Sequence, residues 1–247
     1  MESTDKSFSF KRLLTVLPRG TPLDVALLKE HGLSVHHASH LAKAGWLAHL
    51  GRGVYMLPGD TLARDATLAF LMRRHDSLHV GGKTALQWRG VRHNMSFREV
   101  ITLWGEKQIR LPEWFTARFE CTYQTTRLFD VGLPKEFALQ TLPAGDPDLL
   151  VAAPERALLE TLSDVGKTEL LQDTRDLIEN MRSLRLPVLE QLLAHTTRIK
   201  VVRLARALAE ELDLPWAALA KTYSEKKGGG ARWIAVSKDG DRLDLKA

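Results

Sequence analysis

Apolar residues at the start of the chain recur at helical spacing and are interrupted by turn residues. The first group stops at Pro18 and predicts a helix. Its apolar face consists of Phe10, Leu13, Leu14 and Leu17. Thr21 then has the character of an N-cap and Pro22 that of a first helical residue, so a second helix is predicted from there to Gly32. Two short helices are therefore expected before residue 33.

A third helix is predicted between Ser34, a favourable N-cap, and Gly45, which favours the left-handed conformation that ends helices. Its predicted apolar side consists of Val35, Ala38, Leu41 and Ala42. Two apolar runs follow, Trp46–Leu50 and Val54–Leu57, and the short loop Gly51-Arg52-Gly53 between them predicts a β-hairpin. Three helices followed by a hairpin are typical of a winged helix-turn-helix.

The chain beyond the hairpin has a different pattern, in which helical and strand-like segments are mixed. The predicted helices are Leu62–Met72, Thr84–Trp88, Glu155–Leu162, Glu169–Met181, Pro187–His195 and Ile199–Leu212. The predicted strands are Val100–Trp104, a run around Cys121, and Trp233–Val236. The predicted loops are Pro143–Pro147 and Lys226–Gly230.

These elements predict an α+β protein with two domains. Residues 1–75 are expected to form a winged helix-turn-helix DNA-binding domain. Residues 76–247 are expected to form a larger mixed α/β domain whose C-terminal half is helical. The 247 residues, of which 44% are hydrophobic, are enough to bury a core in each domain.

Composition narrows the class of protein. The net charge of +5 favours a polyanionic partner, although a solvated surface gives the same total. The only cysteine, Cys121, lies in an alternating run and is predicted to be a buried strand residue rather than a nucleophile. One cysteine cannot form an internal disulfide, which indicates a reducing compartment. Leu13-Leu14 is too short an apolar stretch for a signal peptide or membrane span, so we expect a cytoplasmic protein without a membrane partner.

The interval between Glu30 and Asp60 contains no carboxylate. Within it, the third helix carries hydrogen-bond donors opposite its apolar side, because residues three and four apart share a helix face. These donors are His36, His37, His40 and Lys43, with a further hydroxyl from Ser39. A face without acids does not repel phosphates, and its donors can reach base edges in the major groove. We therefore predict that this helix contacts DNA.

Flanking residues extend the predicted DNA-binding surface. Ser34 and the amides of the first helical turn lie at the positive end of the helix dipole, where a phosphate binds. Arg52 lies between two glycines at the hairpin tip and is predicted to reach a phosphate or the minor groove. Arg19 and Lys29 are predicted to contact the DNA backbone. Binding should weaken steeply with salt and strengthen as the pH falls toward about 6, where imidazoles gain charge.

The same helix has two other interpretations. A polar row on an amphipathic helix is commonly only a solvated face. The winged-helix order of the elements and the absence of acids favour DNA binding over that interpretation. His36 and His40 have the i, i+4 spacing of metal ligands, but no nearby carboxylate or cysteine completes a site. We therefore expect no metal and no other cofactor.

Two motifs are similar to parts of catalytic sites. Gly81–Thr84 matches the end of a phosphate-binding loop, but Ser77 occupies a position where the full pattern requires glycine. Asp148 with Glu225 and Lys226-Lys227 could form the acid–acid–lysine set of a metal-dependent nuclease, which is the alternative function. The glycines after Lys227 would not hold such a set rigidly. We therefore expect a protein that is not an enzyme and has no catalytic residue.

The helix predicted from Ile199 is rich in basic residues. These are Arg198, Lys200, Arg203 and Arg206. They either are solvated and paired with Glu210 and Glu211, or they form a second contact with an anionic partner such as RNA or DNA. The pattern alone leaves both interpretations open.

Several short motifs follow one another in a particular order. The N-terminal ones are Leu17–Gly20, Ala44–Leu47, Gly51–Tyr55 and Pro58–Asp60. The later ones are His79–Leu86, Pro154–Glu160 and Ile199–Leu204. In this order they resemble AbiEi-type antitoxins over nearly the whole chain. The run of histidines in the third helix departs from that pattern, and it leaves the operator sequence unpredicted.

The resemblance implies an antitoxin of a type IV toxin–antitoxin system that represses its own operon. Its partners would be double-stranded operator DNA, bound by the winged helix, and a cognate nucleotidyltransferase-like toxin. The toxin would be neutralised through the second domain without a stable complex. The family is not regarded as enzymatic. The residues by themselves lead only as far as DNA binding, and the antitoxin role rests on the resemblance.

Overall fold

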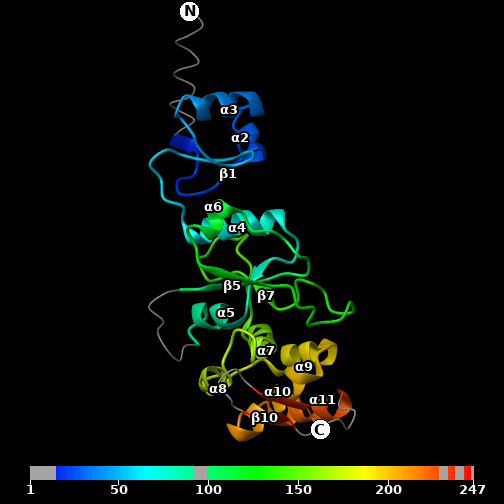
Figure 1. Cartoon of the computed structure of the whole chain (residues 1–247). Coiled ribbons are helices and arrows are strands. Elements are labelled where there is room, and N and C mark those ends of the chain that lie inside the picture. The colour runs from blue at the N-terminus through cyan, green and yellow to red at the C-terminus, as the bar shows by residue number, and fades with distance from the viewer. Residues whose placement is uncertain (1–14, 92–98, 228–232, 237–241, 246–247) are drawn as a thin grey trace, which may run out of the picture. The chain divides into compact units, whose positions relative to one another are not determined.

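The computed structural model is of mixed α+β class, as predicted, and the structure describes residues 15–91, 99–227, 233–236 and 242–245 (Figure 1). The chain divides into two compact units. Unit 1 is drawn from Met1–Arg74, Arg110–Phe119 and Gly145–Leu149. Unit 2 is drawn from His75–Ile109, Glu120–Ala144 and Leu150–Ala247. The first predicted helix lies outside the described residues except for its end, where Leu17 is buried.

A three-stranded antiparallel sheet with the order β1–β3–β2 organises the first part of unit 1. Its strands are β1 (Leu23–Asp24), β2 (Ala48–Gly51) and β3 (Val54–Met56). The predicted hairpin is therefore confirmed. Its turn contains Gly53 with φ +69°, a conformation that glycine adopts without steric cost.

The second helix begins later than predicted, and Thr21 is not its N-cap. Leu23 and Asp24 pair with Tyr55 and Val54 in β1, and α2 covers only Val25–Glu30. The cap is Asp24, whose Oδ1 accepts a hydrogen bond of 2.9 Å from the backbone N–H of Leu27. Pairing with β3 buries Leu23 completely, and this long-range gain outweighs the local preference for an earlier helix start.

The third helix agrees with its prediction at both ends. α3 covers Val35–Lys43, and the Ser34 hydroxyl accepts a hydrogen bond of 3.2 Å from the backbone N–H of His37. Gly45 follows the helix with φ +79°. The core beneath α2, α3 and the sheet consists of Leu17, Leu23, Leu28, Ala38, Leu47, Tyr55 and Leu57.

Two further helices complete unit 1. The predicted helix at Leu62–Met72 is α4, which covers Arg64–Arg74. α6 (Glu113–Thr116) was not predicted. It places the ring of Trp114 against Gly51, where a Cβ added to the glycine would lie 3.1 Å from the ring. The ring centroids of Trp114 and Phe70 are 6.1 Å apart. The end of β2, next to the turn, is thereby packed on α6.

Unit 2 contains a five-stranded mixed sheet with the order β6–β5–β4–β8–β7. The strands are β4 (His79–Val80), β5 (Ile101–Trp104), β6 (Cys121–Gln124), β7 (Leu139–Gln140) and β8 (Val151–Ala152). The predicted strands at β5 and β6 are confirmed. β4, β7 and β8 were missed because two residues are too few to show a period. Cys121 is only half-buried, so its predicted burial was wrong in degree, although burial still raises the pKa of its thiol.

The helices of unit 2 agree closely with the pattern. They are α5 (Gly82–Trp88), α7 (Pro154–Asp164), α8 (Leu171–Ile178), α9 (Leu186–His195), α10 (Ile199–Glu211) and α11 (Ala217–Lys227). Only α11 was missed, because its buried residues are the small Ala220 and Ser224 rather than a leucine stripe. Lys226 and Lys227 therefore end a helix instead of opening a loop, and positions 228–230 lie outside the described residues.

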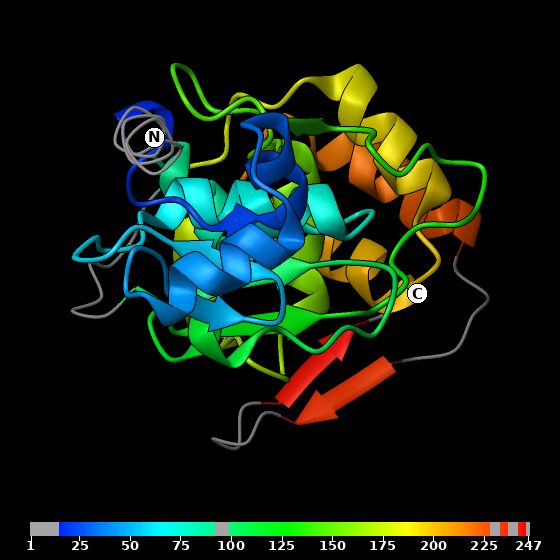
Figure 2. The ribbon, with the colours of Figure 1, turned by 90° about the horizontal axis from the view of Figure 1, so that it is seen from above.

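The predicted final strand is confirmed as β9 (Trp233–Val236), and β10 (Arg242–Leu245) was not predicted. The two strands form an antiparallel ribbon, which Figure 2 shows as a pair of red arrows. Across the described residues, every helix is too short or too polar to cross a membrane.

Helix α7 contributes a buried carboxylate at its C-terminal end. Every residue from Glu155 to Asp164 is buried, and Asp164 is 2% exposed. Its Oδ1 has no hydrogen-bond partner among the described residues. Burial, the largest cause, raises the pKa of Asp164 to about 7, and the carboxylates of Glu169 and Glu160 act in the same direction.

We expect this group to make the stability of unit 2 fall as the pH rises. Because the folded pKa lies above the unfolded value, the folded protein binds the extra proton between about pH 4 and pH 7. A shift of this size corresponds to at most about 4 kcal/mol of unfolding free energy, lost as the pH rises through that window. The Asp164→Asn variant should lack this loss. Urea unfolding between pH 4 and pH 8, with hydrogen exchange of the α7 amides, measures it.

The matched control is Asp213→Asn, which changes an exposed aspartate in unit 2. Its unfolding free energy should follow the pH profile of the unaltered protein. Parallel pH profiles for Asp164→Asn and the unaltered protein would contradict the assignment to Asp164.

Candidate nucleic-acid interface

Helix α3 leaves its donor-rich side exposed. The exposed polar side chains are those predicted to contact DNA: Ser34, His36, His37, Ser39, His40 and Lys43. On the opposite side Ala38 is fully buried, and Leu41 and Ala42 are half-buried against the core. The helix is thus held by a narrow apolar side, and most of its circumference remains available to a partner.

Val35 does not belong to the buried side, contrary to the prediction. Its side chain is 59% exposed. Successive helical residues are rotated by about 100°, so the three core-facing residues of α3 share one arc of the helix surface. Val35 lies just outside one edge of that arc. It occupies the first turn, immediately after Ser34, where the chain enters the helix. The spacing alone does not reveal this, because Val35 lies only about 20° from Ala42 and about 40° from Ser39 around the helix.

Three cations of this region are unpaired. Lys29, Lys43 and Arg52 are exposed and form no ion pair within the described part of the chain. Of the other described arginines of unit 1, all but the exposed Arg118 pair with carboxylates. These pairs include Arg19–Asp60 at 2.5 Å, Arg73–Asp148 at 2.8 Å and Arg74–Asp24 at 3.0 Å. Among the described residues of unit 1, three of the four cations without an ion pair therefore lie on α2, α3 and the hairpin.

Of the two predicted backbone contacts, Lys29 is unpaired and Arg19 is not. Arg19 binds Asp60, whose other oxygen accepts a hydrogen bond of 2.9 Å from the backbone N–H of Gly20. The side chain of Arg19 is 68% exposed, so it could still meet a phosphate, but only in competition with a buried carboxylate.

The hairpin tip is shaped to project Arg52. The β2–β3 register shifts between His49 and Gly51, and such a bulge bends and twists a strand locally. Gly51 packs on Trp114, whereas Arg52 remains exposed. Arg52 is therefore an exposed cation of a turn whose preceding residue is packed on α6.

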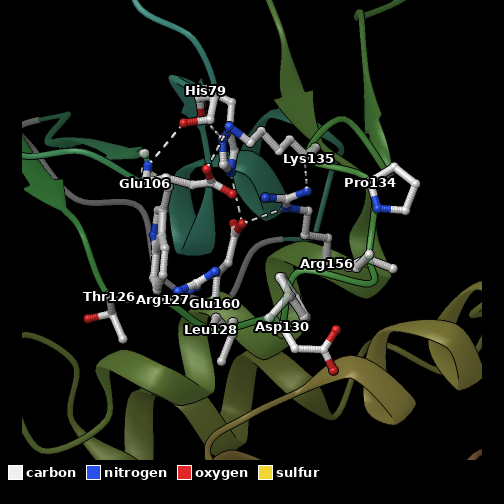
Figure 3. Close-up of a pocket in the computed structure, with 15 residues that line it drawn as sticks. His79, Glu106, Thr126, Arg127, Leu128, Asp130, Pro134, Lys135, Arg156 and Glu160 are labelled. Carbon is white, nitrogen blue, oxygen red and sulfur yellow. Dashed lines mark hydrogen bonds and ion pairs between the residues drawn. The ribbon is translucent and has the colours of Figure 1, made fainter.

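A polar cleft in unit 2 is the second region of interest (Figure 3). Its floor is a buried network centred on Glu160 of α7, which is 1% exposed. Oε1 of Glu160 lies 2.8 Å from His79 Nε2 and accepts a hydrogen bond of 2.9 Å from Arg156 Nε. Oε2 accepts a hydrogen bond of 2.9 Å from the backbone N–H of Gly82. Burial pushes the pKa of Glu160 upward, but His79 and Arg156 hold it below its usual range.

This network accounts for the motif at Gly81–Thr84. The amide of Gly82 is already bound by Glu160, and a Cβ at Gly81 would lie 2.3 Å from the same carboxylate. Thr84 is used within the fold, since its hydroxyl donates to the carbonyl of Val100. The carboxylate of Glu160 thus occupies the place that an anion would need. The glycines are required by close packing and not by a phosphate.

The rim of the cleft is also internally paired. Lys135 lies 3.0 Å from Glu106, and His195 Nδ1 lies 2.8 Å from Asp130. The hydrogen bond from His195, with one from the Gly132 amide, lowers the pKa of Asp130. Carboxylates and cations alternate around the cleft, so its lining selects no particular ligand charge.

The basic residues of α10 do not form an exposed patch. Arg203 is 4% exposed, and Arg206 pairs with Glu210 at 3.1 Å, as the alternative interpretation predicted. Arg198 donates a hydrogen bond of 2.6 Å to the Ser163 hydroxyl, and Lys200 donates to the carbonyl of Val165. A second anionic contact here stays a prediction, and the packing does not favour it.

The residues of the nuclease alternative are not brought together by either unit. Asp148 belongs to unit 1 and pairs with Arg73, whereas Glu225 is an exposed residue of α11 in unit 2. Among the described residues, no three His, Cys, Asp or Glu side chains form a group that could hold a metal ion.

Two family models match consecutive parts of the chain. Residues 6–97 match "Transcriptional regulator, AbiEi antitoxin N-terminal domain". Residues 98–245 match "Transcriptional regulator, AbiEi antitoxin, Type IV TA system". The chain belongs to the AbiEi antitoxin family. The resemblance seen in the sequence is thereby confirmed, and the protein is one of a family of transcriptional regulators and antitoxins of type IV toxin–antitoxin systems.

A solved structure has a similar fold. The RV2827C protein from Mycobacterium tuberculosis matches with a TM-score of 0.55 and 16% sequence identity, over 87% of this chain and 84% of that one. At this identity the likeness concerns the fold alone. No curated protein matches the chain.

Proposed function

We propose that this AbiEi family member represses transcription by binding operator DNA through α3 and the β2–β3 hairpin, within a DNA-binding domain of residues 1–75. The observation that carries the proposal is the exposed, acid-free side of α3, accompanied by three cations without ion-pair partners among the described residues. Those cations are Lys29, Lys43 and Arg52. Elsewhere among the described residues of unit 1, the basic side chains other than Arg118 pair with carboxylates, so the region most attractive to phosphates includes the helix expected in the major groove.

The side chains divide into those that position the protein and those that read the sequence. Ser34 and the first-turn amides bind a phosphate, because both donors and the dipole favour an anion there. Arg52 on the hairpin binds a phosphate or enters the minor groove. His36, Ser39 and His40 lie toward the solvent side of α3 and contact base edges.

The decisive experiment is DNase I footprinting and fluorescence anisotropy with DNA from upstream of the gene. Specific binding to an inverted repeat, with a Kd at least about 1,000-fold below that for unrelated DNA, is expected. Equal affinity for the upstream and unrelated sequences would overturn the proposal.

We further propose that residues 76–247 supply the antitoxin activity in the cytoplasm. Membership of the AbiEi family supports this role, and the toxin expected as partner is a nucleotidyltransferase-like protein encoded by the adjacent gene. Co-expression in bacteria tests it. The full chain should restore growth of cells that produce the neighbouring protein, also when Lys43→Ala and Arg52→Ala remove the contacts to DNA. Continued growth arrest with the unaltered chain would refute the antitoxin role.

A further inference from the structure

The most informative unexplained feature of unit 1 is the exposed valine at the start of α3. Val35 is 59% exposed on a helix whose other solvent-facing residues are polar or alanine. Leaving such a side chain in water forgoes most of the free energy that its burial would contribute. A single exposed apolar residue is ordinary on a protein surface, so its meaning depends on where it lies.

Val35 lies at the end of α3 that would meet the bases. It is the first helical residue after the cap, and the first residues of a recognition helix contact base edges. Val35, Ser39 and Lys43 are spaced four residues apart and therefore follow one strip along the helix. Ser39 adds a hydroxyl and Lys43 an ammonium to that strip, and both groups can form hydrogen bonds with bases and phosphates. Val35 is thus the apolar end of a surface that is otherwise built for DNA.

Major-groove chemistry identifies the matching group. The edges of the four base pairs present donors and acceptors there, and the apolar group among them is the 5-methyl of thymine. Methylated cytosine carries the same group at the same position. We propose that Val35 is a specificity-determining residue that packs on a pyrimidine 5-methyl group in the operator. The inference rests on the proposed DNA-binding function and adds one base preference to it.

Replacing single thymines by deoxyuridine tests the contact from the DNA side. This change deletes the methyl group and leaves every hydrogen-bonding group of the base pair in place. Burial of one methyl group corresponds to about a fourfold change in affinity. At one thymine in each half-site, deoxyuridine should therefore weaken binding of the full chain about fourfold per substitution. A 5-methylcytosine arm, in which each cytosine is methylated in turn, shows whether methylated cytosine can replace thymine at that position.

The Val35→Ala variant tests the same contact from the protein side. Alanine is a good helix former at an exposed position, so the fold should be retained. Its affinity for unmodified operator should fall about fourfold, and the deoxyuridine penalty should drop below twofold. Val16→Ala changes the other exposed valine of unit 1 and should leave the penalty unchanged.

The outcomes separate the two levels of the proposal. Specific binding that is indifferent to every methyl group, or a penalty of equal size in Val35→Ala, overturns the assignment of Val35 and leaves the proposed function intact. An absence of specific binding by the unaltered protein overturns the proposed function, and the assignment of Val35 with it.

Discussion

Replacing Lys43 and Arg52 together by alanine should weaken binding to upstream DNA about 100-fold. Each cation is exposed and has no ion-pair partner among the described residues, so each can bind a phosphate without first breaking an internal contact. A hydrogen bond to a charged group contributes about 1.5 kcal/mol or more, and two of them account for the expected loss. The slope of log Kd against log salt concentration should also flatten by about two units. Anisotropy titrations between 50 and 300 mM salt measure both quantities.

The matched control is Arg110→Ala. Arg110 is also an exposed arginine of unit 1, with 87% of its side chain in solvent, but it lies outside α3 and the hairpin and pairs with Glu113. Its loss should change neither the affinity nor the salt slope beyond about twofold. If the control and the double variant behave alike, the effect is one of total charge. If the double variant binds as tightly as the unaltered protein, α3 and the hairpin are not the interface.

The Glu160→Ala variant should lose about 3–5 kcal/mol of the unfolding free energy of unit 2. Glu160 is buried together with two partners, His79 and Arg156, and also accepts the amide of Gly82. Its removal leaves a buried guanidinium and a buried amide without their acceptor, and such groups are costly to desolvate. Hydrogen exchange of the α5 and α7 amides under native conditions reports this loss for unit 2 without contributions from unit 1.

Glu211→Gln is the control for an exposed ion pair in the same unit. Glu211 binds Arg175 at 2.6 Å, a shorter distance than those in the buried network, yet its side chain is 52% exposed. Solvent screening limits such a pair to less than about 1 kcal/mol. Comparable losses in the two variants would mean that burial is not what makes Glu160 important.

Local signals were enough to predict most of the helices and the hairpin. α7 and α10 carry regular apolar spacing, Ser34 is a good N-cap, and Gly51-Arg52-Gly53 is a strong turn. Each of these preferences is expressed within a few residues, and the structure confirms them. The short strands and α11 escaped prediction because two residues have no period and a helix packed through small residues has no leucine stripe.

The candidate site was predictable in composition and less so in geometry. The absence of acids between Glu30 and Asp60 is a property of the sequence, and it located the region on α3 and the hairpin. Whether a given residue of α3 faces the core depends on how the whole helix is rotated against its neighbours. That rotation exposes Val35, and it is fixed by the packing of Ala38, Leu41 and Ala42.

By itself, the sequence determined most of the helices and the hairpin, the AbiEi motifs and the positive, acid-free character of the third helix, because these depend on neighbouring residues and on composition. Only the tertiary structure decided that Asp24 rather than Thr21 caps α2, that Val35 is exposed, and that Glu160 holds the amide of Gly82. Asp24 is held in β1 by pairing with the distant Val54, and Glu160 and Gly82 are 78 residues apart. Local preferences cannot predict which distant group contacts a buried atom, because that depends on how the helices and strands pack together.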